Sequence, residues 1–118
     1  MILVDTSIWI AHLRVANLQL VRLLDDVQVV SHPFVIGELA CGWLRRRAEV
    51  IGHLRRLPVL APVSHGEALA FIDAHELAGR GIGWVDVHLL ASARLARARF
   101  WTADKALAKV AASLGVAA

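Results

Sequence analysis

The sequence predicts an α/β fold, a three-layer α/β/α sandwich around a mostly parallel sheet of four to five strands. Short runs of strand-forming apolar residues alternate with longer stretches of helical periodicity. This alternation favours parallel strands joined by helices that cover both faces of the sheet. The chain has 118 residues, of which 58% are hydrophobic, enough for a single core. We therefore expect one domain over residues 1–118.

Apolar runs bounded by polar or turn residues mark the expected strands. Residues 2–4, an unbroken Ile-Leu-Val run, are typical of a short strand buried on both faces. The other expected strands are 27–30, 57–60 (shortened by Pro58), 99–102 and, as a fifth strand at the sheet edge, 115–116.

Apolar periodicity and capping patterns predict the helices between these strands. Pro33 suits the first position of a helix, and Ser64 followed by Glu67 is a capping-box pattern. Gly79, Gly81 and Gly83 indicate a flexible turn. The expected helices are 8–13, 17–24, 34–47, 48–56, 64–77, 84–95 and 104–114.

Composition excludes several classes of protein. No run approaches the roughly 18–20 apolar residues of a membrane span, and no leader segment is evident, so we expect a cytoplasmic protein. The lone Cys41 excludes an internal disulfide and a multi-cysteine zinc site, and we expect it in the core. The mean hydropathy of +0.58 favours an apolar subunit interface.

The chain is modestly basic, with a net charge of +3 and a pI near 10.0. Its arginines cluster at 45–47, at 55–56 and at 94, 97 and 99. Solvated helix faces explain any single cluster. Three clusters in so small a domain leave contact with phosphates or an acidic partner as an alternative.

Four of the ten acidic residues, Asp5, Glu38, Asp86 and Asp104, lie within apolar sequence. Asp5 and Asp104 could each be a helix N-cap. Asp86 could lie in the first turn of a helix, where the helix dipole favours a negative charge. Glu38 is expected mid-helix, with Gly42 leaving open space beside it. Asp5 and Asp104 each follow a strand, so both should lie at the carboxyl edge of the sheet, where the helices carrying the other two acids can also reach.

Such a cluster predicts a metal site, because several close carboxylates cannot all stay ionised without cations. Oxygen ligands without a histidine or cysteine pattern favour Mg²⁺ or Mn²⁺. An acid cluster holding such ions suits phosphodiester hydrolysis, in which the metal activates water and stabilises charge on the reacting oxygens.

Four motifs, in order, resemble the PIN domain and, more narrowly, the VapC toxins of toxin–antitoxin pairs. They span nearly the whole chain: Leu3-Val4-Asp5-Thr6-Ser7-Ile8-Trp9, Glu38-Leu39-Ala40-Cys41-Gly42, Asp86-Val87-His88-Leu89-Leu90-Ala91-Ser92-Ala93 and Thr102-Ala103-Asp104. The chain departs from the family pattern at Leu107, where an aromatic is usual, and at Val87 and His88, where smaller residues are usual.

The resemblance implies a three-layer fold and Mg²⁺- or Mn²⁺-dependent cleavage of single-stranded regions of RNA, transfer RNA among the candidates. Asp5, Glu38 and Asp86 would hold the metal, and Asp104 would be the fourth acid, on the side of a second ion. Thr6, Ser7 and Thr102 would orient the acids or a water molecule.

The resemblance also implies partners. Family members are typically homodimers, and a VapB-type antitoxin threads a tail across the acid pocket. Trp43, Leu44 and Ile51 are candidates for the dimer or antitoxin surface; core packing is the alternative, especially for Ile51.

Three other functions stay open from the residues alone. The first is a nuclease of the same fold that acts in RNA maturation or on DNA. The second is a phosphatase or phosphoacceptor domain with Asp5 as nucleophile, although Ser7 stands where such enzymes carry a second aspartate. The third is an inactive binding module, which the presence of all four acids argues against.

Overall fold

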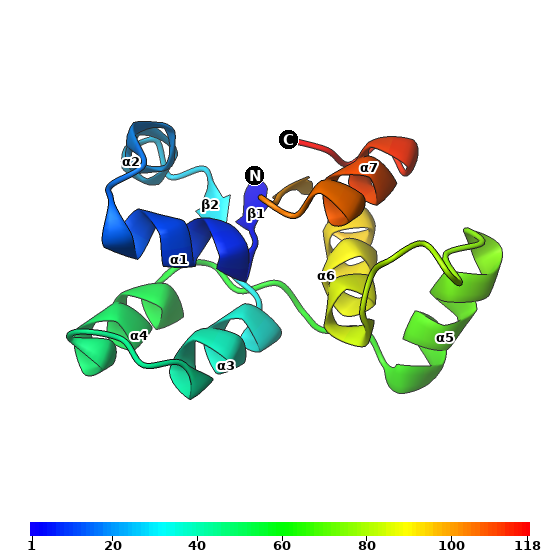
Figure 1. Ribbon diagram of the computed structural model, residues 1–118, viewed down its shortest axis with the longest axis horizontal. Coiled ribbons are helices and arrows are strands. Elements are labelled where there is room, and N and C mark those ends of the chain that lie inside the picture. The colour runs from blue at the N-terminus through cyan, green and yellow to red at the C-terminus, as the bar shows by residue number, and fades with distance from the viewer.

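A parallel sheet of three strands crosses the middle of the protein, as the computed structural model of residues 1–118 shows (Figure 1). The strand order is β2-β1-β3, so the first strand of the chain is the central one. The elements in chain order are β1 (Ile2–Val4), α1 (Thr6–Arg14), α2 (Leu18–Asp25), β2 (Val29–Val30), α3 (Pro33–Cys41), α4 (Arg47–Arg56), α5 (His65–Ala74), α6 (Trp84–Leu95), β3 (Arg99–Trp101) and α7 (Lys105–Ser113).

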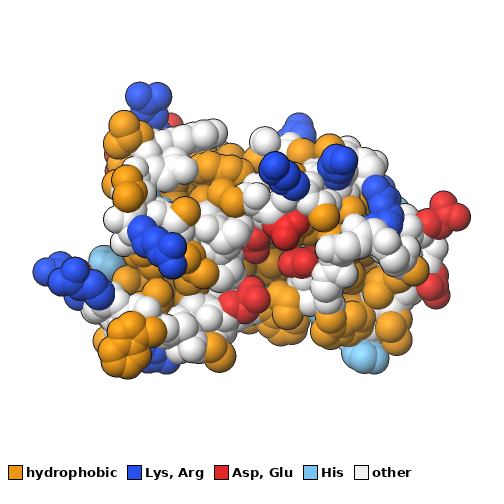
Figure 2. Space-filling view, viewed as in Figure 1, with side chains coloured by type: hydrophobic (Ala, Val, Ile, Leu, Met, Phe, Trp, Pro, Cys, Tyr) orange, Lys and Arg blue, Asp and Glu red, His pale blue; other side chains and the backbone are white.

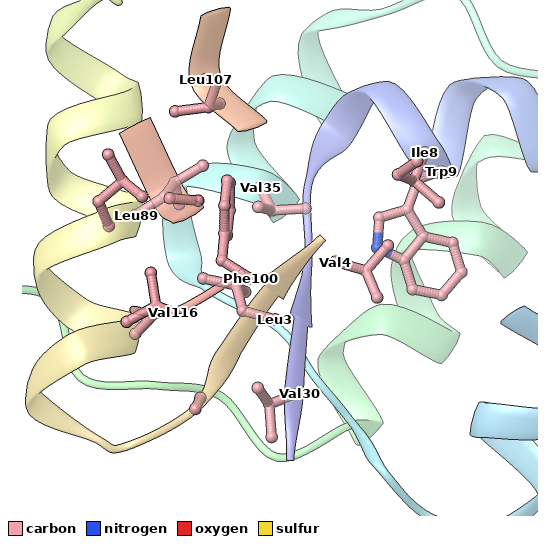
Figure 3. Close-up of a cluster of buried hydrophobic side chains, with 14 of the residues drawn as sticks. Leu3, Val4, Ile8, Trp9, Val30, Val35, Leu89, Phe100, Leu107 and Val116 are labelled. Carbon is pink, nitrogen blue, oxygen red and sulfur yellow. The ribbon is translucent and has the colours of Figure 1, made fainter. Parts of the chain in front are cut away.

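Helices lie on both sides of the strands, with α1, α3 and α4 on one side and α5, α6 and α7 on the other (Figure 1). Successive side chains of a strand point to opposite faces. Val4 accordingly points toward Trp9 of α1, whereas Leu3 lies on the side of Phe100 and Leu89 (Figure 3). The Leu3 and Val4 side chains are fully buried. The apolar run at the start of the chain therefore supplies the centre of the core, as the sequence predicts.

The expectation of four to five strands is wrong, because two of the predicted strands contribute only isolated bridges. Residues 57–60 pair with the chain after β2 through a single Ser31–Val59 bridge, and the C-terminal residues pair with β3 through Phe100–Ala117. Pro58 has no N–H to donate to a longer ladder, and β2 offers only two residues.

The predicted helix 34–47 is also wrong in length, because α3 ends at Cys41 and Gly42 is its C-cap residue. The chain turns through Arg46, which adopts a left-handed φ of 53°, before α4 begins. Cys41, expected in the core, is exposed, and Trp43 in the connecting loop is 100% exposed. Gly42 consequently ends a helix and leaves no open space inside one.

None of the helices combines the length and the apolar character that crossing a membrane would need.

Candidate active site

The carboxyl ends of β1 and β3 bring Asp5 and Thr102 together. Asp5 directly follows β1 and is only 7% exposed. Its Oδ2 atom accepts hydrogen bonds from Thr102 Oγ1 at 2.7 Å and from Ser7 Oγ at 2.8 Å. Asp5 occupies the N-cap position of α1, yet its side chain makes no capping hydrogen bond. The explanation of Asp5 as a helix cap is therefore wrong, and its carboxylate is held by two hydroxyls.

The same hydroxyls fix the segment that carries Asp104. Ser7 Oγ accepts a hydrogen bond from the N–H of Ala103 at 3.0 Å, and Thr102 Oγ1 accepts one from the N–H of Asp104 at 3.1 Å. Asp104 caps α7, because its Oδ1 atom accepts from the N–H of Leu107 at 2.9 Å. Residues 5–7 and 102–104 thus form one hydrogen-bonded unit although they lie at opposite ends of the chain.

Glu38 lies on α3, which packs against α1. Thr6 Oγ1 donates a hydrogen bond to Glu38 Oε1 at 2.8 Å. This bond places the Glu38 carboxylate next to the residue that follows Asp5. Glu38 itself is exposed, although its neighbours in the sequence are apolar.

Asp86 lies in the first turn of α6 and accepts a hydrogen bond at Oδ2 from the N–H of Gly83 at 2.9 Å. Burial raises the pKa of the Asp86 carboxyl above its ordinary value, and the charges of Asp5 and Asp104 raise it further, while the Gly83 hydrogen bond opposes the change. Asp5 and Asp104 are therefore close enough to Asp86 to repel its charge.

Acidic side chains gather at the centre of the face shown in Figure 2. No three acidic, histidine or cysteine side chains stand close enough to hold one metal ion as they lie. Electrostatic repulsion thus links Asp86 to Asp5 and Asp104, and the hydrogen bond from Thr6 holds Glu38 beside Asp5. The four carboxylates do not form a complete metal coordination shell.

The chemistry of these oxygens nevertheless fits a hard divalent cation. Each carboxylate uses one oxygen for a hydrogen bond within the protein, which leaves the second oxygen available for a ligand. The only ion pair of the chain joins His53 and Glu49 at 4.0 Å, so no basic side chain neutralises these acids. Unneutralised carboxylates whose second oxygens are unused are the donors that Mg²⁺ or Mn²⁺ prefers.

His32 is a positioning residue that sequence reasoning missed. Its Nδ1 atom accepts a hydrogen bond from the N–H of Phe34 at 3.0 Å and so caps α3, the helix of Glu38. The ring proton must then lie on Nε2, which donates to Ser92 Oγ of α6 at 3.0 Å. Burial, and secondarily His88, lowers the pKa of His32 from 6.5 to about 4. The only signal in the sequence is a histidine, in place of the usual Ser, Thr, Asp or Asn, before Pro33.

The positions that depart from the family pattern all lie in the interior. Val87, His88 and Leu107 are buried. Their side chains consequently pack the helices that carry Asp86 and Asp104 and do not face the solvent beside the acids.

The sequence of this chain is similar to that of known proteins over nearly its whole length. A sequence model described as "PIN domain" matches residues 2–113. Two relatives from Mycobacterium tuberculosis, strains CDC 1551 / Oshkosh and ATCC 25618 / H37Rv, each carry the name Ribonuclease VapC32. Each is 48% identical over 118 residues, covering 99% of this chain and 95% of the relative. The similarity therefore extends over nearly the whole length of both proteins.

Proposed function

This chain belongs to the VapC family of PIN-domain proteins, and on that premise we propose that it is a metal-dependent endoribonuclease, the toxin of a toxin–antitoxin pair. The relatives that share almost half of its residues are named ribonucleases. The proposed reaction is hydrolysis of phosphodiester bonds in single-stranded regions of RNA, transfer RNA among the candidate substrates.

The observation that carries this proposal is the hydroxyl-bonded acid cluster at the carboxyl edge of the sheet. Asp5 is held by Ser7 and Thr102, and charge repulsion within the cluster acts on Asp86. A buried carboxylate held in place without a cationic partner costs stability. Such an arrangement is typical of a site whose missing partner is a cation.

In this proposal Asp5, Glu38, Asp86 and Asp104 hold Mg²⁺ or Mn²⁺ through the oxygens that make no hydrogen bond within the protein. A bound ion would supply activation of water and neutralisation of charge on the phosphoryl oxygens. Thr6, Ser7 and Thr102 fix the orientation of the acids, as outer hydrogen-bond partners do in metal sites. No side-chain nucleophile is required.

The remaining proposals concern the setting of the enzyme. We infer one PIN domain over residues 1–118 with three layers, acting in the cytoplasm. A cognate VapB-type antitoxin and a second copy of the chain are the proposed protein partners. The fully exposed Trp43 is the candidate for such a contact, because tryptophan is enriched at protein interfaces.

The test is cleavage of total RNA by the purified protein, with Mg²⁺, with Mn²⁺ and with EDTA. The Asp5→Asn variant is run beside each, and Asp73→Asn, an exposed acid of α5, is the matched control. Cuts at few sites that need metal and Asp5 but not Asp73 are the expected result. Cleavage that persists in EDTA or in the Asp5→Asn variant would overturn the proposal.

A further inference from the structure

A cavity lined by three cations lies beside the acid cluster. We propose that Arg80, Lys105 and Lys109 form a subsite that binds a backbone phosphate of the RNA strand next to the one being cut. This inference rests on the proposed function and names a contact that positions its substrate. The cavity has a volume of about 370 Å³, and Ala106 and Val110 complete its lining. No acidic side chain lines it.

The fold brings the three cations together from two segments. Lys105 and Lys109 are four positions apart on α7 and so share one face of the helix. Arg80 lies in the loop between α5 and α6, flanked by Gly79 and Gly81 with left-handed φ values of 74° and 79°. A Cβ atom at Gly81 would lie 3.6 Å from Ala106 Cβ. The loop therefore packs directly on α7, which sets Arg80 against the two lysines.

The positive charge in this cavity is not used within the protein. None of the three side chains joins the single ion pair of the chain, which is His53–Glu49. Arg94 and Arg99, in the other cavity rich in arginine, instead donate hydrogen bonds to the carbonyls of Leu114 and Ala117. Two lysines at this spacing repel each other and weaken a helix. A bound anion removes that repulsion.

Both chain segments that line the cavity lead directly to acids of the cluster. Lys105 directly follows Asp104, and the loop of Arg80 leads into the first turn of α6, which carries Asp86. Basic side chains accordingly lie beside the acidic group in Figure 2. A single strand of RNA carries a negative charge at every nucleotide, so the acids that serve the scissile phosphate repel the neighbouring phosphates. The three cations offset this repulsion on one side and so set the path of the strand.

The experiment measures binding of a fluorescent single-stranded oligouridylate by anisotropy across a potassium chloride series, with Ca²⁺ as the divalent ion. The test variant is Arg80→Gln/Lys109→Gln. The control is Arg22→Gln/Arg55→Gln, which removes the same charge from exposed positions on α2 and α4. We expect Kd to rise roughly tenfold in the test variant. The slope of log K against log salt should fall by about 0.7, as it does when a protein neutralises one phosphate fewer on a single strand. The charge-preserving variant Arg80→Lys/Lys109→Arg should bind as the wild type does.

A second readout separates this subsite from the catalytic centre. Hydrolysis of bis(p-nitrophenyl) phosphate with Mn²⁺ needs the acids but has no neighbouring phosphate to place in the cavity. Its rate should be the same in the wild type, the test variant and the control. Equal RNA affinity and equal salt slope in the test and control variants would overturn the subsite. Loss of RNA affinity in the test variant, with no hydrolysis of any substrate by the wild type, would retain the subsite and overturn the proposed nuclease.

Discussion

At the scale of single residues, two hydroxyls determine how Asp5 is presented. Thr102 Oγ1 donates to Asp5 Oδ2 and accepts from the N–H of Asp104, and Ser7 Oγ makes the equivalent pair of bonds to Asp5 and Ala103. Each hydroxyl therefore orients one acid while it fixes the backbone beside another. The proposed catalytic geometry depends on side chains that never need to touch the substrate.

Thr102→Val removes one of these hydroxyls at nearly constant shape. We expect a loss of RNA cleavage of about 10- to 100-fold, the usual effect of removing an outer partner of a metal ligand, with a loss of unfolding free energy of about 1 kcal/mol. Cleavage rates at several Mn²⁺ concentrations measure the effect. Thr102→Ser keeps the hydroxyl and should restore most of the activity. A valine variant that cleaves at the wild-type rate would contradict this role.

Asp86→Asn should raise the stability of the metal-free protein but lower its activity. Because burial and the neighbouring aspartates raise the pKa of Asp86, its charge costs more free energy in the folded protein than in the unfolded chain. Asparagine keeps an oxygen to accept from the N–H of Gly83 and removes the charge. In EDTA the variant should therefore melt at a higher temperature than the wild type, and its RNA cleavage should fall by about 100-fold or more. A lower Tm for the variant in EDTA would contradict this prediction, because it would show that the charge of Asp86 stabilises the folded protein.

At the scale of elements, His32 joins α3 and α6, which carry Glu38 and Asp86. Its Nδ1 atom caps α3 and its Nε2 atom contacts Ser92 of α6. The cap requires the neutral ring, whose proton then lies on Nε2. Protonation of Nδ1 would remove the cap and place a charge in the core, where His32 is fully buried. The relative position of the two acid-bearing helices is therefore coupled to the protonation of one histidine.

This coupling predicts a protein that loses stability in acid. His32 binds a proton near pH 6.5 in the unfolded chain but only near pH 4 in the folded protein, so the unfolded state holds more protons between these values. The contribution of His32 to the free energy of unfolding should be fully present above about pH 6.5, fall as the pH decreases, and level off near pH 4. The total loss from this residue should be about 3 kcal/mol. The lowered pKa of His88 acts in the same direction, and the raised pKa of Asp86 acts against it.

Urea unfolding at neutral pH and at about pH 5 measures this loss. His32→Asn is the informative variant, because asparagine keeps an acceptor for the N–H of Phe34 and a donor toward Ser92. Its stability should be lower at neutral pH but depend less on pH. An unchanged pH dependence in this variant would assign the acid sensitivity to other groups.

Local sequence patterns predict the elements of this protein better than they predict the contacts between them. The strand at residues 2–4 and the positions of Asp86 and Asp104 at helix starts could be predicted, because local apolar pattern and capping chemistry determine them. The short bridge at Val59 could not, because pairing depends on how many residues a neighbouring strand offers. The bond by which His32 joins α3 to α6 also lay beyond the sequence, since its partner Ser92 is sixty positions away.

At the scale of the whole molecule, the unneutralised acids predict that metal binding would be linked to folding. A ligand that binds only the folded state adds about 2.7 kcal/mol to the unfolding free energy at a concentration a hundredfold above its Kd. We expect Mg²⁺ or Mn²⁺ to raise Tm by several degrees in the wild type and in Asp73→Asn. Asp5→Asn should lose most of this increase. Thermal melts with increasing metal measure it, and equal increases in all three proteins would place the metal elsewhere.

The central position of β1 has a consequence for the order of assembly. β1 is made first, but one of its partners is β3, and the bond between Asp5 and Thr102 spans 97 positions of the chain. Parallel pairings between distant segments form slowly, because loop closure must precede the contacts that stabilise it. A nascent chain that still lacks residues 99–104 has neither the third strand nor Thr102, one of the two hydroxyls that orient Asp5. The acid cluster consequently assembles only after residues 99–104 have been synthesised, and a copy that lacks them has no complete acid cluster.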